Sequence, residues 1–429
     1  MPVQFTKIAP TGNVQRNEVV NNSTIRNIDE GFMWLTNSCD QQAAQFRPGG
    51  SPIRVGVVGA GFVSSFHLRA IQSIPGTRVV GIADIIPERA EKKAKRFGIR
   101  RYHHSLSELL KQDFDVLHVA TPGPTHYELS MSGLQAGRNV FVEKPFTRTV
   151  AEVDQLVAEA KSQQVRIIVD HSLLGEPHFV KAKECIQSGD IGHVHSVHVF
   201  RCGAPPQRIP KRPPYPDLGD PMREVGIHAL YCVSSMLGEI RDVRVLAPKT
   251  GFQTEFEVDE WSLNLECGRG FAHIQLTWNG PAHQVIRVHG DQGQLRIDLA
   301  SGLLLRRRNW PGPQHVLPSV NPVIEATTIL SQLCQRITGY VFGKSVSYQG
   351  IHNFIRTYYA CLRAGDPMPV DHQSVRNIVE WTERVANSIE ETRTTVVGSP
   401  KLAALSQGCS GAATTRPASD ERPLIAPSM

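Results

Sequence analysis

The sequence lacks both a cysteine pattern and a long apolar run. Its eight cysteines form no CxxC pair and follow no regular spacing over 429 residues. This argues against a disulfide framework and favours reduced thiols in a cytoplasmic protein. The most apolar late stretch, residues 323–342, contains Glu325, Gln332, Gln335 and Arg336, so we predict an amphipathic helix and no membrane partner. No basic segment followed by an apolar run stands at the N-terminus, and we expect no secretory signal.

Charge of one sign is not concentrated in the chain either. The net charge of +6 is spread along the sequence, apart from the run Arg306-Arg307-Arg308. No basic stretch interleaved with aromatic residues accompanies this run, so we expect no nucleic-acid partner. With 40% hydrophobic and 20% charged residues, the composition is that of an ordinary globular protein. The length suffices for two domains that each bury a core.

Changes in composition divide the chain into four parts. Residues 1–50 are rich in Asn, Gln and Thr, and residues 394–429 in Ser, Ala, Pro and Thr, so we predict disordered tails. Residues 51–170 alternate short apolar runs with helical patterns, which predicts an α/β domain with a doubly wound parallel sheet. Residues 171–393 show successive strands joined by hairpin-like turns, which predicts an α+β domain with an antiparallel or mixed sheet.

The expected elements follow from periodicity and from proline and glycine boundaries. In the first domain we predict strands at 53–58, 78–83, 115–120, 139–143 and 165–169, and helices at 62–74, 87–98, 125–136 and 150–162. In the second we predict strands at 195–200, 243–247, 260–266, 272–278, 284–289 and 294–299, and helices at 323–342, 350–363 and 374–391.

A glycine turn connects the first predicted strand and helix. Gly59 and Gly61 occupy the first two positions of a G-x-G-x-x-G pattern, with Ser64 at the third. Such a turn permits close backbone approach to a pyrophosphate at the helix N-terminus. Asp84 stands 25 residues after Gly59, at the end of the next strand, where it can accept hydrogen bonds from ribose hydroxyls and repel a 2′-phosphate. We therefore favour NAD over NADP, the alternatives being a coincidental turn and a helix cap at Asp84.

Five segments carry a family resemblance, and they occur in this order: VGVVGAGF, GIADIIPERA, VLHVATPGPTHYEL, AGRNVFVEKP and EVGIHALY. The chain resembles the glucose–fructose oxidoreductase, inositol dehydrogenase and MocA (Gfo/Idh/MocA) family over roughly residues 53–390. The resemblance implies an N-terminal Rossmann domain and a C-terminal α+β domain with an open, mainly antiparallel sheet. It implies NAD(P)-dependent hydride transfer at a secondary alcohol or ketone of a sugar, polyol or sugar derivative. It also implies a homodimer or homotetramer.

The resemblance identifies three catalytic candidates. Lys144 matches the family's EKP lysine, whose following proline often has a cis peptide bond; an ammonium there can stabilise a developing alkoxide. His228 matches the histidine of the acid-x-Gly-x-His motif and is the candidate base. Glu224 replaces the usual aspartate, and on a helix it would share a face with His228. The alternatives are a surface lysine and a core histidine. Tyr231 stands where the family often has a second aspartate.

The same match places the cofactor against the glycine turn and the strand ends. The cofactor-binding candidates are Gly59, Gly61, Phe62, Val63, Asp84, Thr121, Pro122, His126, Glu143 and Lys144. A structural turn is the alternative for Thr121, Pro122 and His126. The proline-rich segment 204–221 is either a lid over the substrate or a solvated loop.

Two further interpretations remain beside the dehydrogenase. The altered acid motif leaves room for a catalytically silent NAD-binding sensor. The second alternative is an NAD-dependent glycosidase, in which transient oxidation at one sugar carbon allows elimination of the glycosidic group. His193, His195 and His198 suggest a metal site, but no carboxylate or cysteine is placed to complete a coordination sphere, so we predict none.

Overall fold

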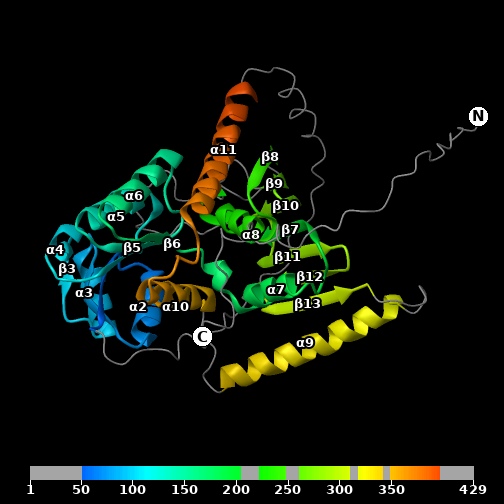
Figure 1. Ribbon diagram of the computed structural model, residues 1–429, viewed down its shortest axis with the longest axis horizontal. Helices are drawn as coiled ribbons and strands as arrows, with labels where there is room; N and C mark the ends of the chain where they lie inside the picture. The colour runs from blue at the N-terminus through cyan, green and yellow to red at the C-terminus, as the bar shows by residue number, and fades with distance from the viewer. Residues whose placement is uncertain (1–50, 204–221, 248–259, 310–316, 342–347, 397–429) are drawn as a thin grey trace, which may run out of the picture.

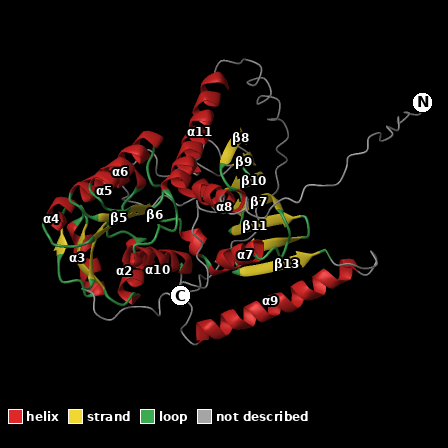
Figure 2. Cartoon of the chain, viewed as in Figure 1, coloured by secondary structure: helices red, strands yellow, loops and turns green. Residues whose placement is uncertain are grey.

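The computed structural model describes residues 51–203, 222–247, 260–309, 317–341 and 348–396. The predicted N-terminal tail, residues 397–429 and the proline-rich segment 204–221 lie outside these residues. Figures 1 and 2 show two sheets side by side, each with helices packed against it. No helix of the described residues is both long enough and apolar enough to cross a membrane.

The first sheet is parallel throughout and has the strand order β3-β2-β1-β4-β5-β6. Its strands are β1 (Ile53–Val58), β2 (Thr77–Ala83), β3 (Tyr102–His103), β4 (Val116–Val119), β5 (Asn139–Val142) and β6 (Ile167–Val169). The four residues of β4 are all buried, as expected for a strand with helices on both faces. The doubly wound parallel sheet predicted from the sequence is confirmed.

Helices cover both faces of this sheet. They are α2 (Ser64–Ser73), α3 (Pro87–Phe97), α4 (Leu106–Leu110), α5 (His126–Gln135) and α6 (Val150–Ser162). The predicted stop of α3 is confirmed, because Gly98 caps it in the left-handed conformation at φ 65°. Thr149 and Glu152 form a capping box that starts α6.

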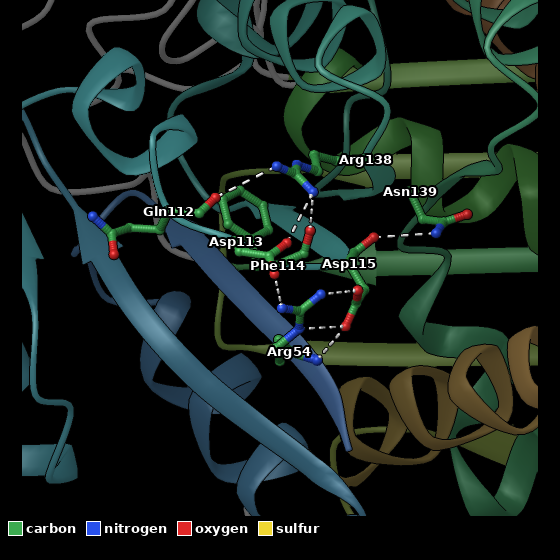
Figure 3. Close-up of polar contacts among 7 residues, drawn as sticks. All are labelled: Arg54, Gln112, Asp113, Phe114, Asp115, Arg138 and Asn139. Atoms are coloured by element: carbon green, nitrogen blue, oxygen red, sulfur yellow. Dashed lines mark hydrogen bonds and ion pairs between the residues drawn. The ribbon is translucent and has the colours of Figure 1, made fainter. Parts of the chain in front are cut away.

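A polar cluster fixes the amino ends of three strands, at the edge of the sheet opposite the glycine turn (Figure 3). The guanidinium of Arg54 in β1 donates to Asp115 at 2.8 Å, and the backbone N–H of Arg54 donates to the same carboxylate at 2.7 Å. Asn139 of β5 donates to the Asp115 carbonyl at 3.1 Å. The Arg54 contact lowers the pKa of Asp115. This cluster aligns β1, β4 and β5, so their carboxyl ends lie together at the other edge.

The second sheet is mixed and has the strand order β13-β12-β11-β7-β10-β9-β8. Its strands are β7 (Val194–Cys202), β8 (Ile240–Leu246), β9 (Glu260–Cys267), β10 (Gly270–Thr277), β11 (His283–Gly290), β12 (Gly293–Asp298) and β13 (Leu303–Arg308). Only β7 and β10 pair in parallel; the other neighbours are antiparallel. The mainly antiparallel second sheet is therefore confirmed as well.

Strand β13 was not predicted, because its arginine run reads as a charged segment. The run follows Leu303, Leu304 and Leu305, and β13 pairs with β12 along its whole length. Arg308 forms an ion pair with Asp190 at 2.7 Å, and Arg307 pairs with Glu325. These acids compensate the charges at the edge of the sheet, so the run forms an edge strand.

The remaining helices do not follow the division of the sequence at residue 170. They are α7 (Pro177–Gln187), α8 (Ile227–Leu237), α9 (Leu317–Val341), α10 (Gln349–Ala364) and α11 (His372–Val396). Helix α10 packs against α2 of the first domain, and α11 packs against α6 and α8. Helix α9 begins six residues before its predicted start and includes Pro322. The late helices therefore connect the two sheets.

Candidate active site

The glycine turn between β1 and α2 packs tightly on one side and is open on the other. Gly59 has a φ of 99°, and a Cβ there would lie 2.4 Å from the carbonyl oxygen of Ala120. A Cβ at Gly61 would meet nothing within 4 Å. No side chain caps the helix that follows, and the N–H groups of Ser65 and Phe66 donate to the carbonyls of Phe62 and Val63 at 3.2 and 2.9 Å. Gly59 thus serves the packing of the turn, and Gly61 leaves room for a ligand.

Asp84 lies beside this turn, at the carboxyl end of β2. Its carboxylate accepts the Ala60 backbone N–H at 2.7 Å and the Ile86 N–H at 2.8 Å. Both oxygens keep a lone pair for a ribose hydroxyl. The helix-cap alternative is not supported, because the N-cap of α3 is Ile86 and no side chain caps that helix. Ile85 and Phe62 flank this edge with 76% and 73% of their surface exposed. Exposed apolar side chains at the strand edge could pack against the planar nucleotide base of a dinucleotide cofactor.

Lys93 is a functional candidate that the sequence reasoning missed. It projects from α3, and its ammonium donates to the Gly61 carbonyl at 2.7 Å and to the Ser65 hydroxyl at 2.6 Å. Burial and the nearby Arg96 and Arg69 lower its pKa. The signal in the sequence is weak, since a lysine on an amphipathic helix is ordinary. In the fold, Lys93 places a cation directly at the glycine turn.

His126, at the start of α5, holds two neighbouring segments together through its ring. The two ring nitrogens of this buried histidine face the carbonyl oxygens of Thr121 at 2.8 Å and Pro145 at 2.6 Å. Burial lowers its pKa, against the opposing effect of those two carbonyls. The ring therefore ties the loop after β4 to the segment after β5. Thr121 and Pro122 lie half-buried at the surface of this loop.

Lys144 connects the first domain to the second. It follows β5, and its peptide bond to Pro145 is cis, as the resemblance implies. Its ammonium donates to the carbonyl oxygen of Glu224 at 2.8 Å and lies 3.2 Å from the Glu224 carboxylate. The lysine and the glutamate are 80 residues apart in the chain. Two of the three catalytic candidates are therefore in direct contact.

We expected Glu224 to lie on a regular α-helix, but the structure places it outside one. Residues Met222–Gly226 form a π-helical turn, and α8 starts only at Ile227. The Glu224 carbonyl oxygen accepts the ammonium of Lys144. A Cβ at Gly226 would lie 2.4 Å from the Met222 sulfur, so the wide turn closes over a position without a side chain. Such turns are frequent at functional sites.

His228 is the third candidate and is held by Tyr231. The Nδ1 atom of His228 lies 2.6 Å from the Tyr231 hydroxyl, which accepts the Leu173 N–H at 3.1 Å. The ring of His171 stacks on Tyr231 with centroids 4.2 Å apart. Burial, followed by the charges of Lys144 and Arg201, holds the pKa of His228 well below its usual range. His228 is consequently neutral at pH 7 and can accept a proton.

Glu143 turns its side chain into the protein, away from the strand edge where we placed it as a cofactor residue. Its carboxylate lies 2.7 Å from Nε2 of His67 and accepts the Lys144 backbone N–H at 3.2 Å. His67 continues to His118 at 3.0 Å, and His118 to the hydroxyl of Tyr359 at 2.9 Å. This buried chain, Tyr359-His118-His67-Glu143, runs from α10 to the residue that precedes Lys144.

Asp170 lies beside His67 and Glu143 at the end of this chain and is completely buried. Within the described part of the chain, neither of its oxygens has a hydrogen-bond donor. Burial and the neighbouring Glu143 raise its pKa well above the usual range. The bond from His67 and the charges of His67 and Lys144 lower the pKa of Glu143, despite its burial. Asp170 is therefore the protonated member of the pair and Glu143 the ionised one.

His67, Glu143 and Asp170 also are the kinds of residue that bind metals. Their nearest donor atoms lie within 4.8 Å of one another. The 2.7 Å contact between His67 and Glu143 is a hydrogen-bond distance, whereas two ligands about 2.1 Å from a shared ion lie farther apart. His193, the first of the three histidines singled out in the sequence, lies exposed beside Asp291 at 3.5 Å. Within the described residues, those three histidines form no metal-binding group.

Comparisons with known proteins agree with this architecture. The family model "Oxidoreductase family, NAD-binding Rossmann fold" matches residues 53–171. The model "GFO/IDH/MocA C-terminal domain" matches residues 179–296. Both halves of an NAD-binding oxidoreductase fold are thus present in one chain. The protein belongs to the Gfo/Idh/MocA oxidoreductase family.

Individual relatives are more distant. Myo-inositol 2-dehydrogenase of Thermotoga maritima is 28% identical over 156 residues, which are 36% of this chain and 47% of that protein. Trans-1,2-dihydrobenzene-1,2-diol dehydrogenase of Mus musculus is 28% identical over 198 residues, or 46% and 59% of the two chains. The chain matches about half the length of these curated relatives.

Solved structures match over a larger share of the chain. The WlbA dehydrogenase from Bordetella pertussis, in complex with NADH and UDP-GlcNAcA, has a TM-score of 0.63 at 21% identity, covering 78% of this chain and 96% of that one. Levoglucosan dehydrogenase, in complex with NADH, has a TM-score of 0.63 at 17% identity, covering 79% and 97%. At these identities the likeness shows the fold.

The residues present fit NAD. The open space over Gly61 suits a pyrophosphate, to which Lys93 would add a positive charge. Asp84 supplies acceptors for ribose hydroxyls beside the exposed Ile85. Lys144 lies farther along the same edge of the sheet, after β5, and contacts Glu224 of the second domain.

Proposed function

We propose that the protein is an NAD-dependent oxidoreductase that transfers hydride between nicotinamide and a secondary alcohol or ketone of a sugar or polyol. The contact of Lys144 with Glu224, in electrostatic range of the neutral His228, carries this proposal. It brings a cation, a carboxylate and a base together at the carboxyl end of the parallel sheet, where ligands of such folds bind.

Each residue has a distinct part in the reaction. NAD, held at the glycine turn and Asp84, would supply the acceptor for the hydride of the carbinol carbon. Lys144 donates a hydrogen bond to the substrate oxygen and stabilises the negative charge that develops there. His228 accepts the hydroxyl proton, which its lowered pKa permits at neutral pH. Glu224 orients the lysine ammonium through their 3.2 Å contact.

Tyr231 and Asp84 support this arrangement. The Tyr231 hydroxyl fixes the plane of the His228 ring through its 2.6 Å contact. Tyrosine adds no negative charge where the family often has aspartate, so nothing at this position raises the basicity of the histidine. The carboxylate of Asp84 favours NAD over NADP, because a 2′-phosphate would lie against a negative charge.

The test is NADH formation at 340 nm with NAD and a panel of polyols, sugars and sugar derivatives. We expect turnover that falls about 10²–10³-fold in K144A while NAD binding stays intact. K161A, on the exposed surface of α6, is the matched lysine control. Full turnover in K144A would refute the proposed role of the lysine. Sugar release without NADH accumulation would support a glycosidase, and NAD binding without turnover would support a sensor.

The open face of the second sheet supports self-association. Phe271 in β10 is 56% exposed and Phe200 in β7 is 36% exposed. Their strands are hydrogen-bonded neighbours in the middle of the sheet. We propose that this face joins copies of the chain into a homodimer or homotetramer, which light scattering of the purified protein measures directly.

A further inference from the structure

Arg201 is a cation of the second domain for which the proposed mechanism has no use. It lies near the end of β7, where its strand neighbours are Leu276 in β10 and Gln284 in β11. Alternation along β7 places it on the same face as the buried Val197 and Val199, which is the face covered by α8. Arg201 therefore belongs to the covered face of the sheet.

Two observations place its guanidinium at the active site. Leu276, its neighbour in the sheet, lies directly under the π-turn, since a Cβ at Gly226 would be 3.2 Å from the Leu276 side chain. The positive charge of Arg201 also acts on His228, and Arg201 in turn interacts with Tyr231. These two residues contact each other at 2.6 Å. Arg201 consequently lies on the covered face of the sheet, within electrostatic range of the base that would receive the substrate proton.

The charge of Arg201 is not compensated within the described residues. It forms no ion pair there, and its hydrogen bond is a long one, to the Gln284 side chain at 3.4 Å. Glu224, the carboxylate of the candidate site, pairs with Lys144 at 3.2 Å. A half-buried guanidinium without a carboxylate is costly, and burial lowers its pKa accordingly. A neutral polyol would leave this cost unrelieved.

We propose that the substrate carries an anionic group, a carboxylate or a phosphate, which pairs with Arg201 while the reacting hydroxyl lies between Lys144 and His228. This inference rests on the proposed function and names its substrate class. A guanidinium binds such groups through two parallel hydrogen bonds. It would thereby select the substrate and fix its distance from the base.

The experiment compares D-glucose with D-glucuronate and D-glucose 6-phosphate, which share one ring and differ in charge. NADH formation is measured for the native protein, R201Q, R201K and R287Q. Arg287 is the matched control, because it is exposed on the opposite face of the same sheet. We expect kcat/KM to favour one anionic compound, and R201Q to reduce that value about 10- to 100-fold, mainly through KM. R201K should recover part of the lost kcat/KM, and R287Q should have the same kcat/KM as the native protein.

The outcomes separate this inference from the proposed function. Equal use of glucose and the anions by the native protein, or an equal loss for all three in R201Q, would overturn the inference and leave the dehydrogenase standing. No NADH from any compound would count against the dehydrogenase. The anion site is then judged by thermal stabilisation of the NADH-bound protein with D-glucuronate or D-glucose 6-phosphate. Stabilisation that R201Q removes supports the site, and its absence in the native protein contradicts it.

Discussion

The two sheets of this protein differ in how their polar groups are satisfied. The parallel sheet has helices on both faces, and buried polar residues such as His67 and Glu143 form a hydrogen-bonded chain beneath its carboxyl edge. The second sheet has one covered face and one face with exposed Phe271 and Phe200. The first therefore provides a rigid, prepared edge for a cofactor. The second provides side chains that reach that edge and a surface free for other contacts.

The difference assigns distinct roles to the two domains. Lys144 is held from behind by the backbone contact with Glu143 and from the front by Glu224. His228 and Arg201 come from the second domain, and their polar contacts are fewer. In the proposed mechanism, Lys144 of the first domain and His228 of the second act together where the two domains meet, and Arg201 of the second domain selects the substrate. We therefore expect substitutions in the two domains to differ in their effects on activity and stability.

The largest expected effect is on catalysis at the contact of the two domains. Replacement of the base in H228Q should lower kcat about 10²–10⁴-fold without loss of NAD binding. Protonation of His228 abolishes its function as a base, so activity of the native enzyme falls as pH drops through the pKa of this group. Because burial, Lys144 and Arg201 lower that pKa, the acid limb of kcat/KM should lie well below pH 6.5. An acid limb at or above pH 6.5 would argue against His228.

The glycine turn gives the next largest effect. G59A would place a Cβ 2.4 Å from the Ala120 carbonyl at a φ of 99°, so we expect a loss of about 1–3 kcal/mol in stability and at least tenfold weaker NAD binding. G61A is the matched control, since its Cβ would meet no protein atom. It should unfold like the native protein and weaken only NAD binding. Thermal unfolding and NAD titration measure the two effects; equal unfolding temperatures for both variants would contradict the packing argument.

Asp170 and Asp115 should respond to pH in opposite directions. Burial and Glu143 raise the folded-state pKa of Asp170, so the folded protein retains that proton as pH rises above the ordinary carboxyl range while the unfolded chain loses it. Stability is therefore lost with rising pH in that window. The asparagine of D170N keeps a donor toward Glu143 without a proton to lose. We expect D170N to gain stability relative to the native protein as pH rises from 5 to 8.

Asp115 provides the contrast. Arg54 lowers its pKa, so its contribution to stability is present above the ordinary carboxyl range and is lost as pH falls through the lowered value. D115N should therefore be less stable than the native protein at pH 7, and the deficit should shrink in acid. Urea unfolding at several pH values measures both variants. The same pH trend for D170N and D115N would contradict the assignment of the proton to Asp170.

The smallest expected effect lies on the open face of the second sheet. F271S removes an exposed ring, so kcat/KM should stay within about twofold and stability within about 0.5 kcal/mol. Light scattering should nevertheless detect a smaller assembly. Loss of activity without a change in mass would place this face in the catalytic machinery and remove the distinction between the two sides of the sheet.

Local patterns in the sequence predicted the first domain well. The alternation of apolar runs and helical patterns predicted five of its six strands, and Gly98 predicted the end of α3. The two-residue strand β3 is too short to carry a period. The π-turn before α8 was missed, because it depends on Met222 packing against Gly226 and not on a repeat along the chain.

The candidate site was predicted in part. Lys144 and Glu224 were singled out by their motifs, and the fold brings them into contact across 80 residues. Lys93 and Arg201 carry no local signal, since an isolated lysine on a helix or arginine on a strand is common. Only the neighbours Gly61 and His228 make them notable.

The sequence by itself determined which segments become strands and helices, where the glycine turn lies and which residues carry chemistry. These are local properties, set by side-chain period and by the conformations that glycine and proline permit. The tertiary structure alone decided that α10 returns to the first domain and that Asp170 is buried against Glu143. It also decided that Arg201 lies within electrostatic range of His228 without an ion-pair partner among the described residues. Burial and electrostatic partnership join residues that lie far apart in the chain, so they exist only once the two sheets have packed together.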